Sequence, residues 1–182
     1  MLSVSEVDLL AVRAHAGQTD KGGAPYIEHV RAVAAGLAPL GQELVMAGLL
    51  HDIVEDTDWT AQRLREAGVP ARVVEIVEAV TNVPGIPYEE KIARITTDPQ
   101  AVLVKIADNA HNSCPHRAAL LPPDKRAYLA TKYRAARARL WPAARPHDIE
   151  AIVRVINPSL LAELNEHGVT REDWPAAGSG LA

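Results

Sequence analysis

The chain has 182 residues and a formal net charge of −4, with 48% hydrophobic and 23% charged residues. This is the length and composition of one globular domain with a sizeable core. The acidic balance argues against a general nucleic-acid-binding protein, and the single cysteine excludes an internal disulfide and indicates a reducing compartment. The amino terminus lacks the basic segment of a signal peptide and no apolar run is long enough to span a membrane, so we expect a cytoplasmic protein with no membrane or nucleic-acid partner.

Apolar residues recur at helical spacing along most of the chain. Ser5, with Asp8 three residues further on, predicts the start of a first helix over 6–16. A polar, Gly-rich loop that ends at Pro25 separates it from a second helix, YIEHVRAVAAGL. Residues 42–54 predict a strongly apolar third helix, of the kind that lies at the centre of a bundle.

Helical patterns continue beyond this point. Thr57 and Asp58 predict the cap of a short helix that runs to Glu66. Asp98-Pro99 predicts the start of a helix containing AVLVKIADNAHN, although the β-branched residues of that run also resemble a buried strand. Further helices are predicted over 70–81, 88–96 and 123–141, followed by two shorter ones that divide near Asn157-Pro158.

The sequence contains neither an internal repeat nor a linker that would separate two domains. We therefore expect an all-α helical bundle formed by a single domain over 1–182. Residues 143–182 are expected to form a helical extension and a tail, and the end of that tail, DWPAAGSGLA, is expected to be frayed.

The window LLHDIVEDT contains the most informative chemistry. His51 and Asp52 follow an apolar run, and Glu55 and Asp56 return to the same side of a helix one turn later. Imidazole and carboxylate groups together form a ligand set for a divalent metal ion, and a neighbouring carboxylate can orient a metal-bound water or take its proton. The alternative is a solvated helix end with ordinary capping acids.

Asp108 strengthens the metal interpretation. It follows the apolar run VLVKIA, where an unpaired carboxylate would be costly. Lys105 and Asn112 lie three residues before it and four after it, on the same helix face, and suit a phosphate. The alternative is a surface ion pair between Lys105 and Asp108. His29, on the second predicted helix, is by itself as well explained as a core histidine.

Three segments carry a family resemblance: AHAGQTDKGGAPYIEHVRAVA, AGLLHDIVEDT and VLVKIADNAHN. In this order they resemble the signature blocks of the HD superfamily, in its RelA/SpoT-type (p)ppGpp hydrolase branch, which includes stand-alone small alarmone hydrolases such as the metazoan SpoT homologue. The resemblance covers about residues 8–142. No synthetase segment follows, so we expect a stand-alone hydrolase with the HD-domain helical fold.

The resemblance implies a role for each matching residue. It implies one Mn²⁺ ion held by His29, His51, Asp52 and Asp108, and an attacking water positioned by Glu55 and Asp56. It implies that the substrate is of the (p)ppGpp type, from which pyrophosphate is removed at the ribose 3′ position. It also implies contacts to the nucleotide or its phosphates from Lys21, Lys105 and Asn112.

One position departs from the family pattern. The first loop of the family usually carries Arg-Lys, with the arginine against the guanine base, whereas this chain has Asp20-Lys21. A carboxylate does not stack on a base as a guanidinium does and repels phosphates. If the protein is an alarmone hydrolase, an Asp20→Arg substitution is predicted to improve binding of ppGpp; if the substrate is another nucleotide, the same change is predicted to leave activity on it unchanged or to impair it. The metal residues are not affected by this difference.

Other polar residues are weaker candidates. Tyr128 and Lys132 lie one turn apart in the stretch KRAYLATKYRAARARLW, and could hold a base and a phosphate at the rim of a pocket; a solvated helix face is the alternative. His15 is expected in the core. His111 and His116 flank the Asp108 segment, either beside the metal residues or exposed, and Cys114 shows no sign of a catalytic triad.

Three functions fit these observations. The first is a Mn²⁺-dependent pyrophosphohydrolase of guanosine tetra- or pentaphosphate. The second is the same metal chemistry on another nucleotide, such as a 5′-deoxynucleotide, NADPH or a different 3′-phosphorylated nucleotide. The third is a regulatory HD module that binds a nucleotide without turnover, against which the presence of both Glu55 and Asp56 argues.

Overall fold

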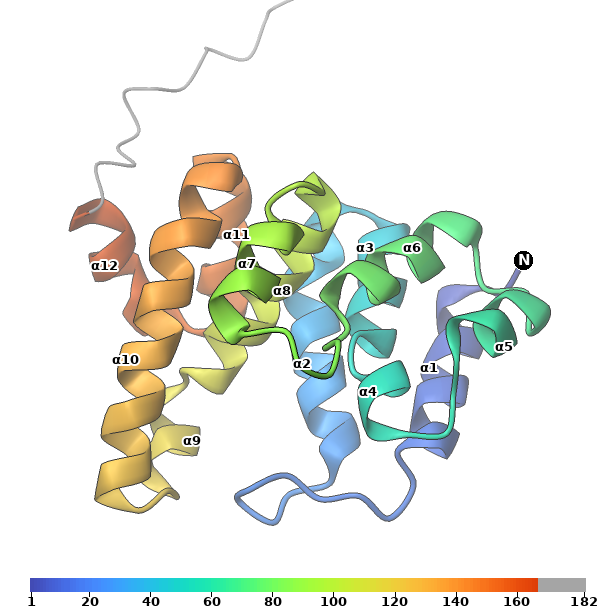
Figure 1. The fold of residues 1–182 in the computed structure, drawn as a ribbon, viewed down its shortest axis with the longest axis horizontal. Coiled ribbons are helices and arrows are strands. Elements are labelled where there is room, and N and C mark those ends of the chain that lie inside the picture. The colour runs from blue at the N-terminus through green and yellow to red at the C-terminus, as the bar shows by residue number, and fades with distance from the viewer. Residues whose placement is uncertain (167–182) are drawn as a thin grey trace, which may run out of the picture.

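The computed structural model describes residues 1–166. Within this range the regular elements are helices joined by loops, and there is no strand, only one isolated bridge between Thr19 and Pro25. The prediction of an all-α bundle is confirmed (Figure 1). The α-helices are α1 (Val4–Ala14), α2 (Tyr26–Leu37), α3 (Gln42–Leu50), α4 (Ile53–Asp56), α5 (Ala61–Glu66), α6 (Ala71–Val80), α7 (Tyr88–Ile95), α8 (Pro99–Asn112), α9 (Pro115–Ala119), α10 (Pro123–Leu140), α11 (Pro146–Ile156) and α12 (Leu161–Glu166), with three short 3₁₀ helices at Ala38–Leu40, Trp141–Ala143 and Pro158–Leu160.

The first helix begins two residues earlier than the sequence pattern predicted. Ser3 is its cap: the Ser3 hydroxyl accepts a hydrogen bond from the backbone N–H of Glu6, and the Glu6 carboxylate accepts one from the backbone N–H of Ser3 at 2.8 Å. This is a complete capping box. Ser5 and Asp8 therefore lie inside the helix, and their predicted role as its cap was wrong.

The start of α5 also differs from the prediction. Thr60 caps this helix by accepting a hydrogen bond from the backbone N–H of Arg63 at 3.2 Å, and neither Thr57 nor Asp58 does so. By contrast, the predicted start of α8 at Asp98 is confirmed, because the Asp98 carboxylate accepts the first free N–H groups of that helix.

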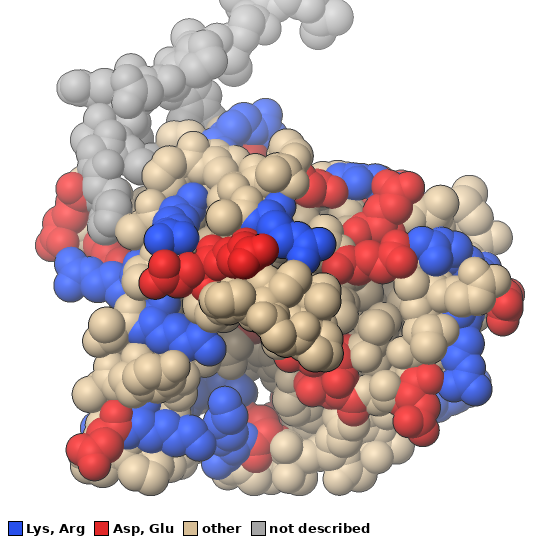
Figure 2. Space-filling model, in the orientation of Figure 1, with Lys and Arg blue, Asp and Glu red and all other residues tan. Residues whose placement is uncertain are grey.

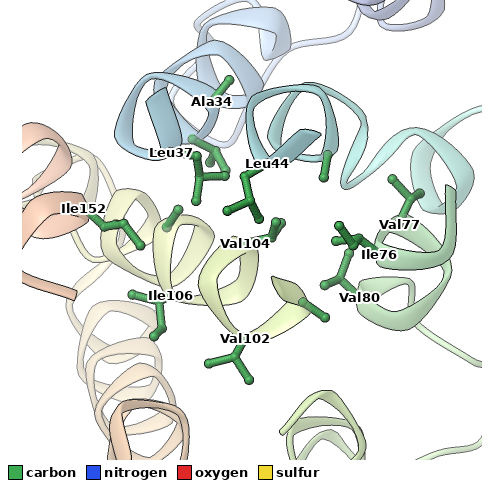
Figure 3. Close-up of a cluster of buried hydrophobic side chains, with 14 of the residues drawn as sticks. Ala34, Leu37, Leu44, Ile76, Val77, Val80, Val102, Val104, Ile106 and Ile152 are labelled. Carbon is green, nitrogen blue, oxygen red and sulfur yellow. The ribbon is translucent and has the colours of Figure 1, made fainter. Parts of the chain in front are cut away.

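The core forms where α2, α3, α6, α8 and α11 pack together. Figure 3 shows Leu37 of α2, Leu44 of α3 and Val104 of α8 pointing toward one another at its centre. The run AVLVKIA is helical, as expected, and most of the α8 side chains around it are buried. Helix α11 packs against both α2 and α8, so part of the segment after residue 142 contributes to the core.

The apolar helix predicted over 42–54 is interrupted. Helix α3 ends at Leu50, with His51 as its C-cap. Asp52 has φ −105° and ψ −1°, and the short helix α4 begins after it. The predicted division of the last helices at Asn157-Pro158 is confirmed. The sequence DWPAAGSGLA, predicted to be frayed, lies outside the described residues. Within residues 1–166, no helix combines the length and the apolarity that crossing a bilayer requires.

Candidate active site

Four side chains from separate parts of the chain converge in the interior. His29 belongs to α2, His51 and Asp52 lie at the interruption between α3 and α4, and Asp108 belongs to α8. The Nε2 atom of His29 lies 3.5 Å from a carboxylate oxygen of Asp52 and 3.5 Å from one of Asp108. The Nε2 atom of His51 lies 2.9 Å and 3.8 Å from the same two oxygens.

These separations suit atoms that share a metal ion. Ligand bonds of about 2.1 Å at right angles place neighbouring ligand atoms about 3 Å apart. The Nδ1 atom of His51 lies 2.8 Å from the carbonyl oxygen of Gly48, which places the ring proton there and leaves the Nε2 lone pair free. That Nε2 atom is buried and has no hydrogen-bond partner among the described residues. The residues present therefore fit a divalent cation, with His29, His51 and Asp108 as its core set.

His51 and Asp52 converge at the interruption between α3 and α4. On a continuous helix the two side chains would point about 100° apart. In the structure the Asp52 carboxylate lies 2.9 Å from Nε2 of His51, and the Asp52 carbonyl oxygen accepts the backbone N–H groups of Glu55 and Asp56 at 3.1 Å and 2.9 Å. Glu55 and Asp56 are thus placed beside the metal residues by α4, rather than by the next turn of α3.

A second set of polar groups holds the metal-binding carboxylates. The Tyr26 hydroxyl donates to Asp52 at 2.7 Å, the Lys105 ammonium donates to Asp108 at 2.6 Å, and the Asn112 amide donates to the other oxygen of Asp108. Burial raises the pKa of Asp108, but the Lys105 charge opposes this and the net pKa is lowered. Lys105 and Asp108 form an ion pair, as one alternative predicted, but they form it in the interior, at 13% and 7% exposure.

His111 belongs to the same network. Its Nδ1 atom lies 2.7 Å from the Nδ1 atom of His29, and the two rings are stacked. Burial is the largest cause that lowers the pKa of His111 to about 3, so this ring is neutral and can accept the proton that His29 carries on Nδ1. The contact therefore directs the Nε2 lone pair of His29 toward the carboxylates, as metal-bound histidines require.

Glu55 is held by residues that the sequence did not single out. The backbone N–H of Asn82 donates to Glu55 at 3.1 Å, the Asn82 amide donates to its other oxygen, and the Lys91 ammonium lies 3.9 Å away. Lys91 also donates to the Asn82 side chain. Burial and the charge of Lys105 lower the pKa of Lys91 to about 8. A lysine on an otherwise apolar helix face was the only sequence signal for this group.

Asp56 is supported from the opposite side. Its backbone carbonyl accepts a hydrogen bond from the Gln18 amide at 2.7 Å, and Gln18 in turn contacts Nδ1 of His15 at 2.8 Å. His15 is buried, as expected. Burial raises the pKa of the Asp56 carboxyl, and the negative charge of Asp52 raises it further. A carboxylate with a raised pKa beside a metal site is suited to accept a proton.

A pocket of about 390 Å³ opens above these carboxylates. Glu55, Asp56 and all of the metal residues except His51 line it, and its walls carry five cationic side chains: Lys21, Lys91, Lys105, Lys132 and Arg117. In the space-filling view, Lys and Arg side chains gather around a hollow between α10 and the loop that precedes α2 (Figure 2). Five carboxylates line the same pocket, so its side chains balance in charge, and a divalent ion at the metal residues would make it net positive and suited to a substrate with several negative charges.

The predicted rim residues on α10 have different positions. Lys132 lines the pocket, with its ammonium 4.1 Å from the centre of the Tyr88 ring. Tyr128 is 66% exposed and does not line it, so its predicted contact with a base is not supported by its position. Tyr88 and Tyr133, which the sequence did not single out, provide the aromatic surface of the pocket. His116 is exposed.

The remaining sequence candidates have structural roles. Cys114 is buried and its thiol contacts the backbone carbonyl oxygens of Ala110 and Ile156 at 3.6 Å and 3.4 Å, so it is not placed as a nucleophile. Asp20 lines the pocket but does not present a bare carboxylate to it, because Arg117 of α9 donates to it at 2.6 Å. The expectation that Asp20 repels phosphates stays a prediction, and the carboxylate that would do so is paired with a guanidinium.

Known proteins match both the sequence and the fold. The family model described as HD domain matches residues 9–140. A guanosine-3′,5′-bis(diphosphate) 3′-pyrophosphohydrolase from Haemophilus influenzae is 38% identical over 135 residues, which cover 67% of this chain and 20% of that protein. The bifunctional (p)ppGpp synthase/hydrolase SpoT from Escherichia coli is 37% identical over 135 residues, covering 67% of this chain and 19% of that protein.

The chain thus spans about one fifth of the length of these relatives. A solved structure of a metazoan ortholog of SpoT, described as hydrolysing ppGpp, superposes with a TM-score of 0.64 at 21% identity and covers 92% of this chain and 96% of its own. At that level of identity the match supports the fold. Because the family model matches most of its length, the chain belongs to the HD domain family.

Proposed function

We propose that this protein is a Mn²⁺-dependent hydrolase that removes pyrophosphate from the 3′ position of (p)ppGpp. One observation carries the proposal: two histidines and two aspartates converge at the base of a cation-lined pocket, beside two further carboxylates. The relative from Haemophilus influenzae is named for this reaction and the one from Escherichia coli for (p)ppGpp synthesis and hydrolysis, and each matches this chain over 135 residues.

The ligand set suggests the metal. His29, His51, Asp52 and Asp108 would hold it, and two nitrogens with two carboxylates suit Mn²⁺ or Fe²⁺ better than they suit a cation that prefers oxygen ligands alone. When bound, such an ion lowers the pKa of a coordinated water and stabilises negative charge on a phosphoryl oxygen.

Asp56 and Glu55 are the proposed catalytic residues. Asp56, with its raised pKa, accepts a proton from the attacking water as the water oxygen bonds to phosphorus. Glu55, fixed by Asn82 and by the charge of Lys91, orients that water. The bond between phosphorus and the ribose 3′ oxygen breaks, so that the products are a guanosine 5′-diphosphate or 5′-triphosphate and pyrophosphate.

The cationic side chains of the pocket bind the phosphates. Lys21, Lys91 and Lys132 line the pocket and can compensate the charge of the two phosphate groups and of the transition state. The charge of Lys105 is engaged by Asp108 at 2.6 Å, so this lysine supports the metal residue first and the substrate second. Asn112 lines the same pocket and is also proposed to contact the substrate, although its amide donates to Asp108.

A second candidate is the same reaction class with another nucleotide as substrate, such as a 5′-deoxynucleotide, NADPH or a different 3′-phosphorylated nucleotide. The observation that favours it is Asp20, which stands where the family usually carries a base-stacking arginine. A nucleotide panel incubated with Mn²⁺-loaded protein, with phosphate and pyrophosphate release as the readout, separates the two candidates.

Substitution of the two acids tests the catalytic assignment. Glu55→Gln and Asp56→Asn should each lower kcat about 10²- to 10⁴-fold, because general acid–base help is lost. Both should retain bound Mn²⁺, measured by metal analysis after gel filtration. Asp58→Asn is the matched control, since Asp58 is an exposed acid two residues further on. Wild-type kcat in both test variants would contradict the assignment.

A further inference from the structure

Asp20 and Arg117 form a bridge between the loop before α2 and helix α9. One carboxylate oxygen of Asp20 accepts the backbone N–H groups of Gly22 and Ala24 at 2.8 Å and 3.1 Å. The other accepts from Nη1 of Arg117 at 2.6 Å, and the two side chains are 8% and 19% exposed. The loop thus fixes Asp20, and Asp20 fixes the guanidinium of Arg117 in the wall of the pocket.

Most of the donors of that guanidinium are not used by the protein. Arginine carries five N–H donors in one plane. Within residues 1–166, the hydrogen bond to Asp20 is the one bond that this side chain makes. Arg117 therefore presents further coplanar N–H groups from a fixed position, which is the arrangement used to recognise two neighbouring acceptor atoms.

The surroundings of Arg117 suit a nucleobase better than a phosphate. Asp20 offsets the positive charge of the guanidinium and would repel an approaching phosphate. A side cavity of about 30 Å³ shares Arg117 and Tyr133 with the main pocket. Its wall includes Leu120, Leu121 and Leu129, together with Lys21 and Asn112 at the edge that it shares with the main pocket. This wall combines an aromatic ring, apolar side chains and a guanidinium that a carboxylate neutralises.

Lys132 provides a contrast within the same pocket. The ammonium of Lys132 lies over the Tyr88 ring, has no carboxylate bonded to it among the described residues, and lies outside the lining of the side cavity. An uncompensated ammonium is the better partner for a phosphate. The phosphates are therefore expected on the side of Lys132, and the base on the side of Arg117.

We propose that Arg117, positioned by Asp20, recognises the base of the substrate and selects guanine over adenine. Guanine presents two adjacent acceptors, O6 and N7, to a pair of coplanar N–H donors, whereas adenine has an N–H₂ donor in place of O6. This inference rests on the proposed function in taking a purine nucleotide as the substrate. It makes Arg117 a specificity residue and Asp20 a positioning residue.

Binding of GDP and ADP tests the proposal without catalysis, because the two ligands carry the same phosphates. Calorimetry should show that the wild type prefers GDP, and that Arg117→Ala weakens GDP binding about 5- to 150-fold while changing ADP binding little. Arg134→Ala is the matched control, since it removes the same charge from the exposed face of α10 and should change neither affinity. Equal loss for GDP and ADP would mean that Arg117 binds a phosphate, and this would overturn the proposal, as would a wild type without a preference.

Asp20→Asn tests the positioning role. The amide oxygen of asparagine can still accept the two backbone N–H groups of the loop. Its NH₂ group, however, puts a donor where Asp20 offers an acceptor to the N–H of Arg117. The variant should keep its fold and its kcat, while the KM for ppGpp rises and the preference for GDP falls. An unchanged KM and an unchanged GDP preference would overturn the positioning role.

The outcomes separate this inference from the proposed function. A wild type that hydrolyses no 3′-pyrophosphorylated nucleotide, but loses its GDP preference in Arg117→Ala, would overturn the proposed function and support the base contact. A wild type that hydrolyses ppGpp, with a GDP-to-ADP preference that Arg117→Ala leaves unchanged, would support the function and overturn the base contact.

Discussion

A methyl group added at Gly48 should force apart the two helices that carry the metal-binding histidines. Gly48 lies in α3 where this helix crosses α2, and a Cβ atom built there would lie 2.9 Å from Cα of Ala34 and 2.9 Å from a methyl carbon of Leu37. Ordinary carbon contacts are about 3.5–4.0 Å. Because part of the obstacle is the backbone of α2, a side-chain rotation cannot remove it.

The cost follows from two opposing effects. Overpacking in a close-packed core costs about 1–3 kcal/mol, while replacing a helical glycine with alanine returns up to about 1 kcal/mol. We expect Gly48→Ala to lose about 1–2 kcal/mol of unfolding free energy. The same displacement moves His29 on α2 relative to His51, whose ring is held by the carbonyl of residue 48, so Mn²⁺ affinity should fall about tenfold or more.

Urea denaturation with and without Mn²⁺, together with a Mn²⁺ titration, measures both effects. Gly36→Ala is the matched control, because the methyl group it adds in α2 meets the side chain of Ile156, and the nearest backbone atom in the way, the carbonyl oxygen of Ile152, lies at an ordinary 3.6 Å. It should lose less stability and keep its metal affinity. Wild-type stability and wild-type Mn²⁺ affinity in Gly48→Ala would refute the argument that this close approach sets the geometry of the site.

Three further predictions concern stability. Mn²⁺ at one hundred times its Kd should stabilise the fold by about 2.7 kcal/mol, and an unchanged melting temperature after chelation and re-addition would count against a metal that joins α2, α3 and α8. Asp98→Ala should cost about 1–2 kcal/mol in urea titrations at pH 7, because it removes the cap of α8 and the 2.6 Å ion pair with Arg72. Burial raises the pKa of Asp98, but Arg72 and the helix amides lower it below its usual value, so this difference should be full above about pH 4 and should shrink as the pH falls through the folded-state pKa. Arg137→Ala should cost about 3 kcal/mol, because this buried arginine donates to Asn109 and to Glu163 and so joins α10 to α8 and α12; a loss below about 1 kcal/mol by calorimetry would show that the link is weak.

Periodicity predicted the helices of the core but not the details of their ends. The spacing of apolar residues in 70–81 and 88–96 is a property of the local sequence, and the structure has helices there. The start of α1 is ambiguous from sequence because Ser3 and Ser5 are each followed three residues later by an acid. In the structure Ser3 is the cap, and the helix that it starts buries Val7 and Ala11.

The composition of the candidate site was predictable, but the contacts within it were not. His29, the His51-Asp52 pair and Asp108 were selected by residue type and family pattern, and the structure brings them together. The interruption of the helix at Asp52 has no strong local signal, since neither glycine nor proline marks it.

The partners of Asp20 and Glu55 could not be predicted for a different reason. Asp20 and Arg117 are 97 residues apart, and Glu55 and Asn82 are 27 residues apart. Such pairs depend on how distant helices pack, and a single sequence contains no periodic pattern that connects them. The same packing reverses the prediction for Asp20→Arg: a second guanidinium beside Arg117, without the bonds to the loop, should now weaken the binding of ppGpp.

The central claim is tested most directly by product analysis of one reaction. Purified protein loaded with Mn²⁺ is incubated with ppGpp, and the products are separated by anion-exchange chromatography. We predict GDP and pyrophosphate in equal amounts, with turnover that is lost after chelation and restored by Mn²⁺. Intact ppGpp after incubation with protein that demonstrably holds the metal, or release of single phosphates instead of pyrophosphate, would contradict the proposed function.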